Sequence, residues 1–164
     1  MSGQGAPATG AVPGAADLDV VVIAALWHTR VMDGLLAGAQ RALVDSGVAS
    51  TRIVRVPGAF ELPVAAARIA RADVDAIIAL GVVIRGGTPH FDYVCNAATD
   101  GLTRVSVRSG VPIGFGVLTC DDDAQALDRA GLAGSKEDKG YQAAQAALST
   151  AVTLSSYPRP VNPR

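Results

Sequence analysis

One segment of the chain combines the residue types that proton transfer and anion binding need. It reads Gly86-Gly87-Thr88-Pro89-His90. The glycines permit a tight turn, Thr88 can cap a helix, and Pro89 suits the first helical position. Such a helix start offers free backbone N–H groups to a phosphate or carboxylate. His90 in the first turn would be held neutral by the helix dipole and could accept a proton. The segment is also a common structural device, so both interpretations stay open.

Two further side chains have both a chemical and a structural interpretation. Trp27, the only tryptophan, follows an apolar run and could stack on a flat ring or fill a core or an interface. Glu61, one of two glutamates, opens a helical segment. Its carboxylate could accept hydrogen bonds from the hydroxyls of a sugar-like ligand or simply interact with the helix dipole. His28 has a weaker claim than either.

The remaining reactive residue types give ambiguous or negative signals. Arg129 ends a helical segment, where a guanidinium can bind either a phosphate or the last carbonyls of the helix. The acidic run at residues 121–123 fits a solvated loop better than a metal site, because adjacent carboxylates face different directions, and no metal is expected. Cys95 and Cys120 lack the spacing of metal ligands, and we expect two buried, reduced thiols.

These residues must be positioned by an alternating series of strands and helices. Strands are predicted at residues 19–26, 52–56, 75–83 and 112–118, and helices at 29–46, 61–71, 91–105, 123–130 and 138–154. Two strand segments are continuous apolar runs, as in strands buried on both faces of a parallel sheet. We therefore predict an α/β protein, a three-layer α/β/α sandwich of flavodoxin-like type with a four-stranded parallel sheet in the order 2-1-3-4. Ligands bind beyond the carboxyl ends of such strands, which Trp27, Glu61 and His90 all follow closely.

Length and composition narrow the classes of function. The 164 residues fit one domain, expected at 17–158 between a disordered tail at 1–16 and a short tail at 159–164. The apolar fraction of 49% against 18% charged residues hints at self-association. A net charge of −1 without basic runs predicts no nucleic-acid partner. Residues 1–16 resemble neither a signal peptide nor a membrane anchor, so we expect a cytoplasmic protein that does not contact a membrane.

Six short motifs, in this order and spacing, resemble the 6,7-dimethyl-8-ribityllumazine synthase family. They are PGAFELP at 57–63, ALGVVIRG at 79–86, TPHFDYV at 88–94, GVLT at 116–119, QALDRA at 125–130 and DKG at 138–140. The resemblance extends from about residue 20 to residue 154. It implies a cofactor-free transferase of riboflavin biosynthesis. Its reaction would condense 5-amino-6-(D-ribitylamino)uracil with 3,4-dihydroxy-2-butanone 4-phosphate, giving 6,7-dimethyl-8-ribityllumazine, phosphate and water.

The resemblance also implies roles for individual residues. Trp27 takes the aromatic position that stacks on the pyrimidine ring, where many members have Phe. His90 takes the position of the proton-transfer residue. The pyrimidine, the ribityl chain and the phosphate would be held by residues of three segments, namely Ala59, Phe60 and Glu61; Val82, Val83 and Ile84; and Gly87 and Thr88.

A second group of residues would act in a neighbouring subunit's site. Phe115 takes the position of an aromatic wall and Arg129 that of a phosphate ligand, and Lys139 would help from the same side. The family forms pentamers and, in some members, hollow icosahedral shells, so the resemblance implies a homo-oligomer with active sites between subunits. The sequence leaves the choice between a pentamer and a larger assembly open. Riboflavin synthase, which consumes the product, is the implied pathway partner.

Two other functions are compatible with the fold class. A flavodoxin-like FMN carrier needs a Ser/Thr-Gly phosphate loop after the first strand, and a signalling receiver domain needs paired acids there. The chain instead has LWHT at residues 26–29. An assembly protein without catalysis is the other alternative. The presence together of four residues favours an enzyme, namely Trp27, Glu61, His90 and Arg129.

Overall fold

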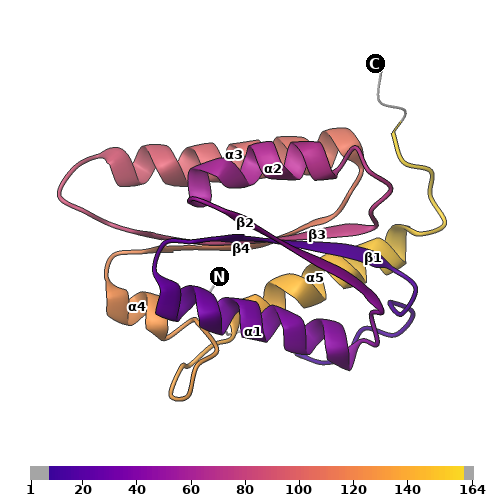
Figure 1. The fold of residues 1–164 in the computed structure, drawn as a ribbon, viewed down its shortest axis with the longest axis horizontal. Coiled ribbons are helices and arrows are strands. Elements are labelled where there is room, and N and C mark those ends of the chain that lie inside the picture. The colour runs from indigo at the N-terminus through magenta and orange to yellow at the C-terminus, as the bar shows by residue number, and fades with distance from the viewer. Residues whose placement is uncertain (1–7, 161–164) are drawn as a thin grey trace.

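A four-stranded, all-parallel sheet in the order β2-β1-β3-β4 forms the centre of the molecule (Figure 1). The computed structural model describes residues 8–160. The strands are β1 (Asp19–Ala25), β2 (Ser50–Val56), β3 (Ala76–Ile84) and β4 (Ile113–Cys120). The helices are α1 (Thr29–Asp45), α2 (Leu62–Ile69), α3 (His90–Ser109), α4 (Asp123–Leu127) and α5 (Lys139–Leu154), with a 3-10 turn η1 (Ala59–Glu61) before α2. The flavodoxin-like α/β fold and the predicted strand order are confirmed.

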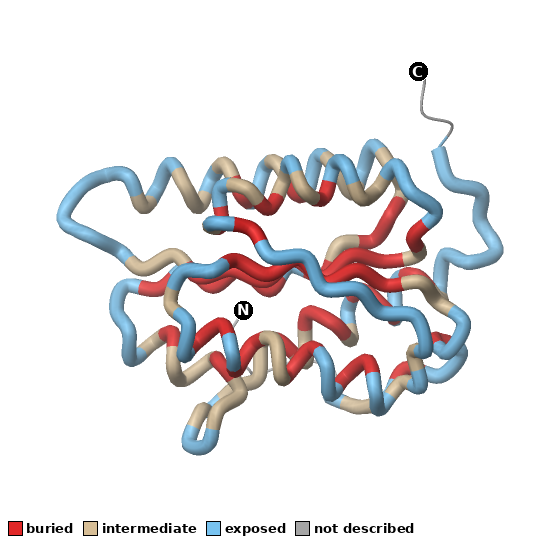
Figure 2. Tube along the Cα trace, in the orientation of Figure 1, coloured by how far each residue is buried: buried red, intermediate tan, exposed pale blue. Residues whose placement is uncertain are grey.

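Helices cover both faces of the sheet and bury the central strands β1 and β3, whereas the edge strand β2 is largely exposed (Figures 1 and 2). Alternate residues of β1 point to opposite faces, as the two-residue period of a strand requires. Val20 and Val22 pack in a core with α1 and α5, whereas Val21 and Ile23 pack in a second core with α2 and α3. The continuous apolar runs of the sequence therefore correspond to strands that are buried on both sides.

The α4 helix is shorter than the sequence predicts, because tertiary contacts end it. It stops at Leu127 rather than at Ala130. The carbonyl of Asp128 accepts a hydrogen bond from the Glu137 N–H at 2.9 Å, and the Arg129 carbonyl accepts one from the Lys139 N–H at 3.0 Å. These carbonyls bond to a returning segment of the chain instead of continuing the helix.

Residues 8–16 pack against the domain, in contrast to the disordered tail expected for 1–16. Val12 and Ala15 are buried in the core that α1 and α5 share. The Val12 N–H donates to Ser46 Oγ at 3.0 Å, and Gln145 donates to the carbonyl of Ala8 at 2.9 Å. Small apolar side chains bury without any periodic pattern, which explains the difference. Residues 1–7 of the expected tail lie outside the described residues.

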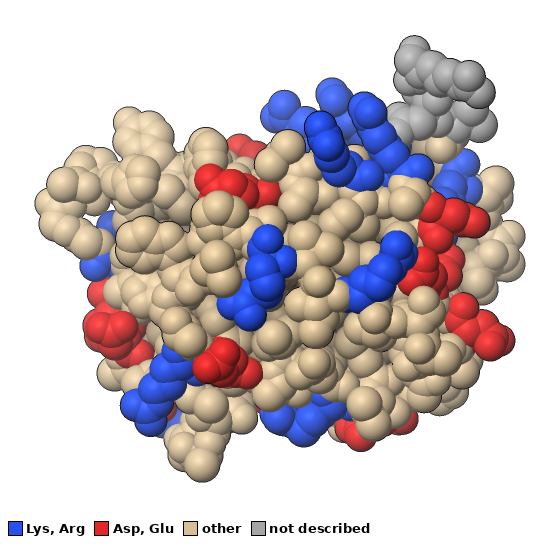
Figure 3. Space-filling view, in the orientation of Figure 1, with Lys and Arg blue, Asp and Glu red and all other residues tan. Residues whose placement is uncertain are grey.

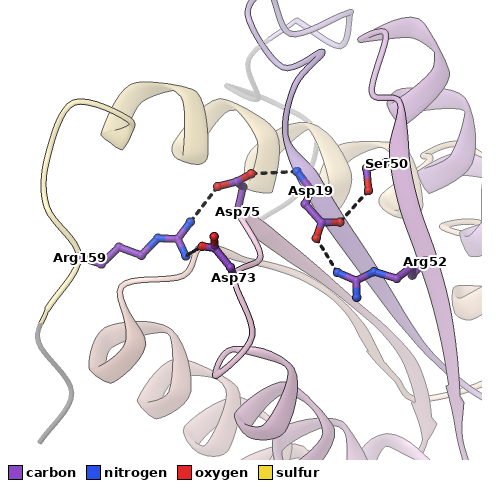
Figure 4. A network of polar contacts seen from close by, with 6 residues as sticks. All are labelled: Asp19, Ser50, Arg52, Asp73, Asp75 and Arg159. Atoms are coloured by element: carbon purple, nitrogen blue, oxygen red, sulfur yellow. Dashed lines mark hydrogen bonds and ion pairs between the residues drawn. The ribbon is translucent and has the colours of Figure 1, made fainter.

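A polar network joins the amino ends of the strands to the segment after α5 (Figure 4). Asp19 accepts hydrogen bonds from Ser50 Oγ at 2.9 Å and from Arg52 at 2.6 Å, and its own N–H donates to Asp75 at 2.8 Å. Arg159 donates to the other oxygen of Asp75 at 2.8 Å. The segment after α5 is thus attached at the sheet edge opposite to the carboxyl ends of the strands. Residues 161–164 of the expected C-terminal tail lie outside the described part of the chain.

Candidate functional site

The loops after β1 and β2 form one surface at the carboxyl edge of the sheet. The Leu26 N–H donates to the Pro57 carbonyl at 3.3 Å and so joins the two loops. A Cβ atom built on Gly58 would stand 3.3 Å from Glu61 Oε2 and 3.5 Å from Trp27 Cδ1. The aromatic and the acidic groups therefore both lie beside Gly58, in the space that a side chain at this position would approach. Trp27 is 68% exposed, which leaves its ring available to a flat ligand.

The backbone after β1 turns sharply to direct Trp27 outward. His28 has φ of 59° and ψ of 58°, and it is the only non-glycine residue with a positive φ in the described part of the chain. The left-handed conformation is unfavourable for a residue with a Cβ and marks functional or strained positions. His28 is also the N-cap of α1. Its strained turn thus lies between the exposed tryptophan and the first residue of α1.

The carboxylate of Glu61 is not engaged in helix capping. Glu61 occupies the N-cap position of α2, but its side chain makes no capping hydrogen bond. An interaction with the helix dipole needs no such hydrogen bond, so the oxygens can also accept hydrogen bonds from a ligand. Its two neighbours differ: Ala59 is buried against Gly81, whereas Phe60 is 60% exposed. Ala59 shapes the base of this surface and Phe60 projects from it.

The start of α3 places His90 in the first helical turn, as predicted. The N-cap is Pro89, whose φ of −62° and ψ of −5° are already helical, and the Asp92 N–H donates to its carbonyl at 3.0 Å. The expectation that Thr88 caps the helix is wrong, because the helical turn closes on Pro89 and no side chain caps it. His90 and the loop before it are exposed. The first turn of this 20-residue helix is consequently open to an anion.

The end of β3 lies between these two surfaces. β3 pairs with β1 on one side and β4 on the other. Val82 is buried, and Val83 and Ile84 are half-buried. They form an apolar strand end from which the loop to His90 leaves. The turn that carries Glu61 follows β2 and the His90 helix follows β3, so both begin at the carboxyl ends of parallel strands.

Arg85 is a residue of this edge that the sequence analysis did not single out. Its Nε donates to Asp121 at 3.1 Å, its Nη1 lies 3.5 Å from Asp92, and its guanidinium carbon lies 4.1 Å from the centroid of the Phe91 ring. The hydrogen bond from Arg85, and to a smaller extent the one from Gln125, lowers the pKa of the Asp121 carboxyl. The hydrogen bond to Asp121 likewise raises the pKa of Arg85. The sequence signal for Arg85 was its position as a basic residue directly after β3, the strand whose last residue pairs with Cys120.

Arg129 and Lys139 belong to the layer of helices that contains α1. Arg129 follows α4, and Lys139 is the first residue of α5. The Arg129 guanidinium donates to the Gln125 carbonyl at 2.8 Å, which is the helix-end contact that the sequence left as an alternative. Lys139 forms an ion pair with Glu137 at 2.5 Å and donates to Gln142 at 2.9 Å. Both cations are partly buried and are therefore held in defined positions.

Phe115 lies away from the other expected site residues of its own chain. It pairs with Ala79 in the sheet, whereas Cys120 pairs with Ile84 at the strand end. Five residues of strand separate Phe115 from Cys120, or about 16 Å at the usual rise per residue. Phe115 is 45% exposed and lines a hollow of about 250 Å³ against α3. A single chain does not bring this ring to Trp27 or His90.

The two cysteines differ in burial. Cys120 is buried as expected, but Cys95 on α3 is only half-buried, because α3 lies at the surface of its layer. Desolvation raises the pKa of both thiols. In the described residues no group of three or more His, Cys, Asp or Glu side chains is arranged to hold a metal ion. No helix within residues 8–160 is both long and apolar enough to cross a membrane.

Basic side chains gather outside this edge, over α2 and α3 (Figure 3). A hollow of about 410 Å³ between these helices is lined by Arg71, Arg104 and Arg108 together with apolar residues. None of the expected site residues lies in its wall. The aromatic, acidic and histidine side chains at the carboxyl edge therefore remain the candidate site.

The fold and this edge together define a class, a flavodoxin-like α/β protein with its candidate site beyond the carboxyl ends of parallel strands. Comparison with known proteins then gives the family. The sequence model of the 6,7-dimethyl-8-ribityllumazine synthase family matches residues 17–155, and the chain belongs to this family. It is thus an enzyme of riboflavin biosynthesis, in the transferase class.

Close relatives have the same name as the family, and the similarity extends over nearly their whole length. The chain is 68% identical to the 6,7-dimethyl-8-ribityllumazine synthase of Kocuria rhizophila, over 94% of this chain and 99% of the relative. It is 67% identical to that of Renibacterium salmoninarum, with the same coverage, and 68% identical to that of a Nocardioides species, with 94% and 95% covered. The matches thus cover nearly the whole length of each of these three relatives.

Proposed function

We propose that the chain condenses 5-amino-6-(D-ribitylamino)uracil with 3,4-dihydroxy-2-butanone 4-phosphate to 6,7-dimethyl-8-ribityllumazine, phosphate and water. The observation that carries the proposal is the placement of Trp27 and Glu61 around Gly58, at the same end of the parallel sheet as the start of α3 at His90. An exposed ring, a free carboxylate and an open helix start suit, in turn, a pyrimidine, a ribityl chain and a phosphate. Membership of the family supports the same assignment.

The reaction needs proton transfers more than it needs strong nucleophiles. The 5-amino nitrogen attacks the ketone carbon, and loss of water gives an imine. Removal of the C3 proton next to the imine then expels phosphate from C4 and leaves an enol, which tautomerises to a ketone at C3. Attack of the ribitylamino nitrogen on this ketone, with loss of a second water, closes the ring. His90 would accept and return protons, and the start of α3 would bind the leaving phosphate; the position of His90 in the first turn of α3 supports both roles. Much of the rate enhancement would come from holding the two substrates side by side.

We further propose that the complete site lies between two copies of the chain. Val82, Val83 and Ile84 would lie beneath the pyrimidine, Ala59 and Phe60 beside it, and Gly87 and Thr88 at the phosphate. Phe115, Arg129 and Lys139 would come from the neighbour. The position of Phe115 far from the carboxyl edge, and its exposure on the α3 face, support this division. The assembly would be a homopentamer or a larger particle built from pentamers.

Incubation with the two substrates tests the proposed function. Formation of the lumazine, followed by its absorbance, is the expected result, and addition of riboflavin synthase should convert the product to riboflavin. Reactions that lack either substrate are the controls. Light scattering of the same sample reports the size of the assembly. A correctly folded assembly that leaves both substrates unchanged would refute the proposal.

A further inference from the structure

Arg85 connects three elements at the carboxyl edge of the sheet. It follows the last residue of β3, and its N–H donates to the carbonyl of Cys120 at 2.9 Å, at the end of β4. Its guanidinium lies over the Phe91 ring and contacts Asp92, both in the first turn of α3. The side chain therefore attaches the turn that carries His90 to the ends of two strands.

The contacts continue from Arg85 to the residues expected to serve the neighbouring site. Asp121 accepts from Arg85 and from Gln125 Nε2, and its N–H donates to Gln125 Oε1 at 3.1 Å. The carbonyl of Gln125 accepts from Arg129 at 2.8 Å. A continuous path of side-chain and backbone contacts thus links the helix start at His90 to Arg129.

The chemistry of the guanidinium suits this place. A planar guanidinium can stack on an aromatic ring and still direct N–H groups at carboxylates in its plane, whereas an ammonium cannot do both. The loop between Arg85 and α3 contains two glycines and its helix start has no side-chain cap. Without Arg85, the first turn of α3 would lose its polar attachment to β4.

We propose that Arg85 is a positioning residue that fixes the His90 helix start and, through Asp121 and Gln125, the place of Arg129. It touches neither substrate in this scheme and acts through the residues that do. The proposal rests on the proposed function, since it assigns His90 and Arg129 to two adjacent active sites. It also predicts that the position of His90 in one active site depends on the same contacts that position Arg129 in the adjacent active site.

The test compares Arg85→Lys and Arg85→Gln with the same changes at Arg52. Arg52 forms an Arg–Asp ion pair with Asp19 at the opposite sheet edge and is similarly exposed, at 55% against 45% for Arg85. Misplacement of reacting groups by about 1 Å lowers rates by about a hundredfold, so we expect kcat to fall by about ten- to a hundredfold in both Arg85 variants. KM should rise for the phosphate substrate and stay unchanged for the pyrimidine. The Arg52 variants should keep wild-type kcat and KM.

Two further measurements separate positioning from loss of fold. Asp121→Asn should lower kcat as Arg85→Gln does, and the double variant should lose little more than either single variant. Amide hydrogen exchange at residues 92–95, in the first hydrogen-bonded turn of α3, should be faster in Arg85→Gln and unchanged in α1, a result that does not depend on any substrate. Wild-type kinetics in Arg85→Lys, or unchanged exchange at 92–95, would overturn the proposal. A wild-type protein that makes no lumazine would refute the proposed function instead, and the exchange measurement would still decide on Arg85.

Discussion

Gly58 is the residue on which the acidic and the aromatic groups of the candidate site depend. The nearest atoms to a Cβ at this position belong to Glu61 and Trp27. A methyl group there would press on the Glu61 carboxylate at 3.3 Å, closer than most Cβ contacts in proteins. Replacement by Ala would therefore shift the Glu61 carboxylate by a few tenths of an ångström and leave Trp27 in ordinary van der Waals contact.

The role of His90 is testable because the residue is exposed. We expect His90→Gln to fold normally and to lower kcat by about 10²- to 10⁴-fold, the usual contribution of a placed acid–base group. Steady-state kinetics and the circular dichroism spectrum check the two parts. The matched control is His28→Asn, since Asn tolerates the left-handed conformation of that turn. Equal turnover of wild type and His90→Gln would exclude proton transfer by His90.

The cysteines should make the protein sensitive to alkaline pH. Burial raises the pKa of Cys120 and of Cys95, and at Cys95 the nearby Asp92 adds to the effect. A raised pKa means that stability is fully present below the ordinary thiol pKa and declines as pH rises through the raised value. We expect alkylation at neutral pH to label Cys95 slowly and Cys120 only after unfolding, as measured by intact mass. Rapid labelling of Cys120 in the folded protein would contradict this burial.

At the scale of single residues, the sequence predicted candidate site residues where a short local motif contains the residue types that the chemistry needs. The helix start at His90 was readable from five consecutive residues. The role of Arg85 was not, because its partner Asp121 is 36 residues away and the contact exists only once β3 and β4 pair. The left-handed turn at His28 also has no signal in residue type, since a glycine would be the usual choice.

At the scale of elements, the close approach of α1 and α5 depends on Gly140. A Cβ built there would lie 2.0 Å from the carbonyl oxygen of Leu35, an impossible contact with backbone. Gly140 follows Lys139 and is buried, so this approach also sets where the lysine begins its helix. Gly140 therefore determines both how closely these two helices pack and where Lys139, the cation proposed to help at the phosphate, is positioned.

We expect Gly140→Ala to destabilise the fold by about 1–3 kcal/mol, the range for overpacking a close contact. Chemical denaturation followed by circular dichroism measures the change in the free energy of unfolding. Gly10→Ala is the matched control, because no atom lies within 4 Å of a Cβ at that position. A Gly140 variant as stable as the Gly10 variant would show that α1 and α5 can move apart freely.

The order and type of the strands and helices could be predicted because each follows from a local pattern. Strand positions shifted by only one or two residues between prediction and structure. The length of α4 and the packing of residues 8–16 could not be predicted. In the first case Glu137 and Lys139 bond to the carbonyls that would have continued the helix. In the second, burial of Val12 and Ala15 depends on α1 and α5 being in place.

At the scale of the whole molecule, the division of the site between copies has a direct test. His90→Ala and Arg129→Ala should each inactivate the site to which that residue belongs, with Arg129→Ala chiefly weakening the phosphate substrate. Co-assembly of the two inactive variants should restore activity, because about a quarter of the sites then pair an intact His90 with an intact Arg129. The two variants mixed without co-assembly are the control. Failure of co-assembled variants to recover turnover would place the whole site in one chain.

The exposed position of Trp27 has a practical consequence for such experiments. It is the only tryptophan of the chain, so indole fluorescence excited selectively comes from the candidate site alone. A pyrimidine stacked on the ring should quench this emission, and a neighbouring subunit that covers the ring should shift it to the blue. The protein thus carries its own optical probe, with which substrate binding and subunit association can be followed without any label.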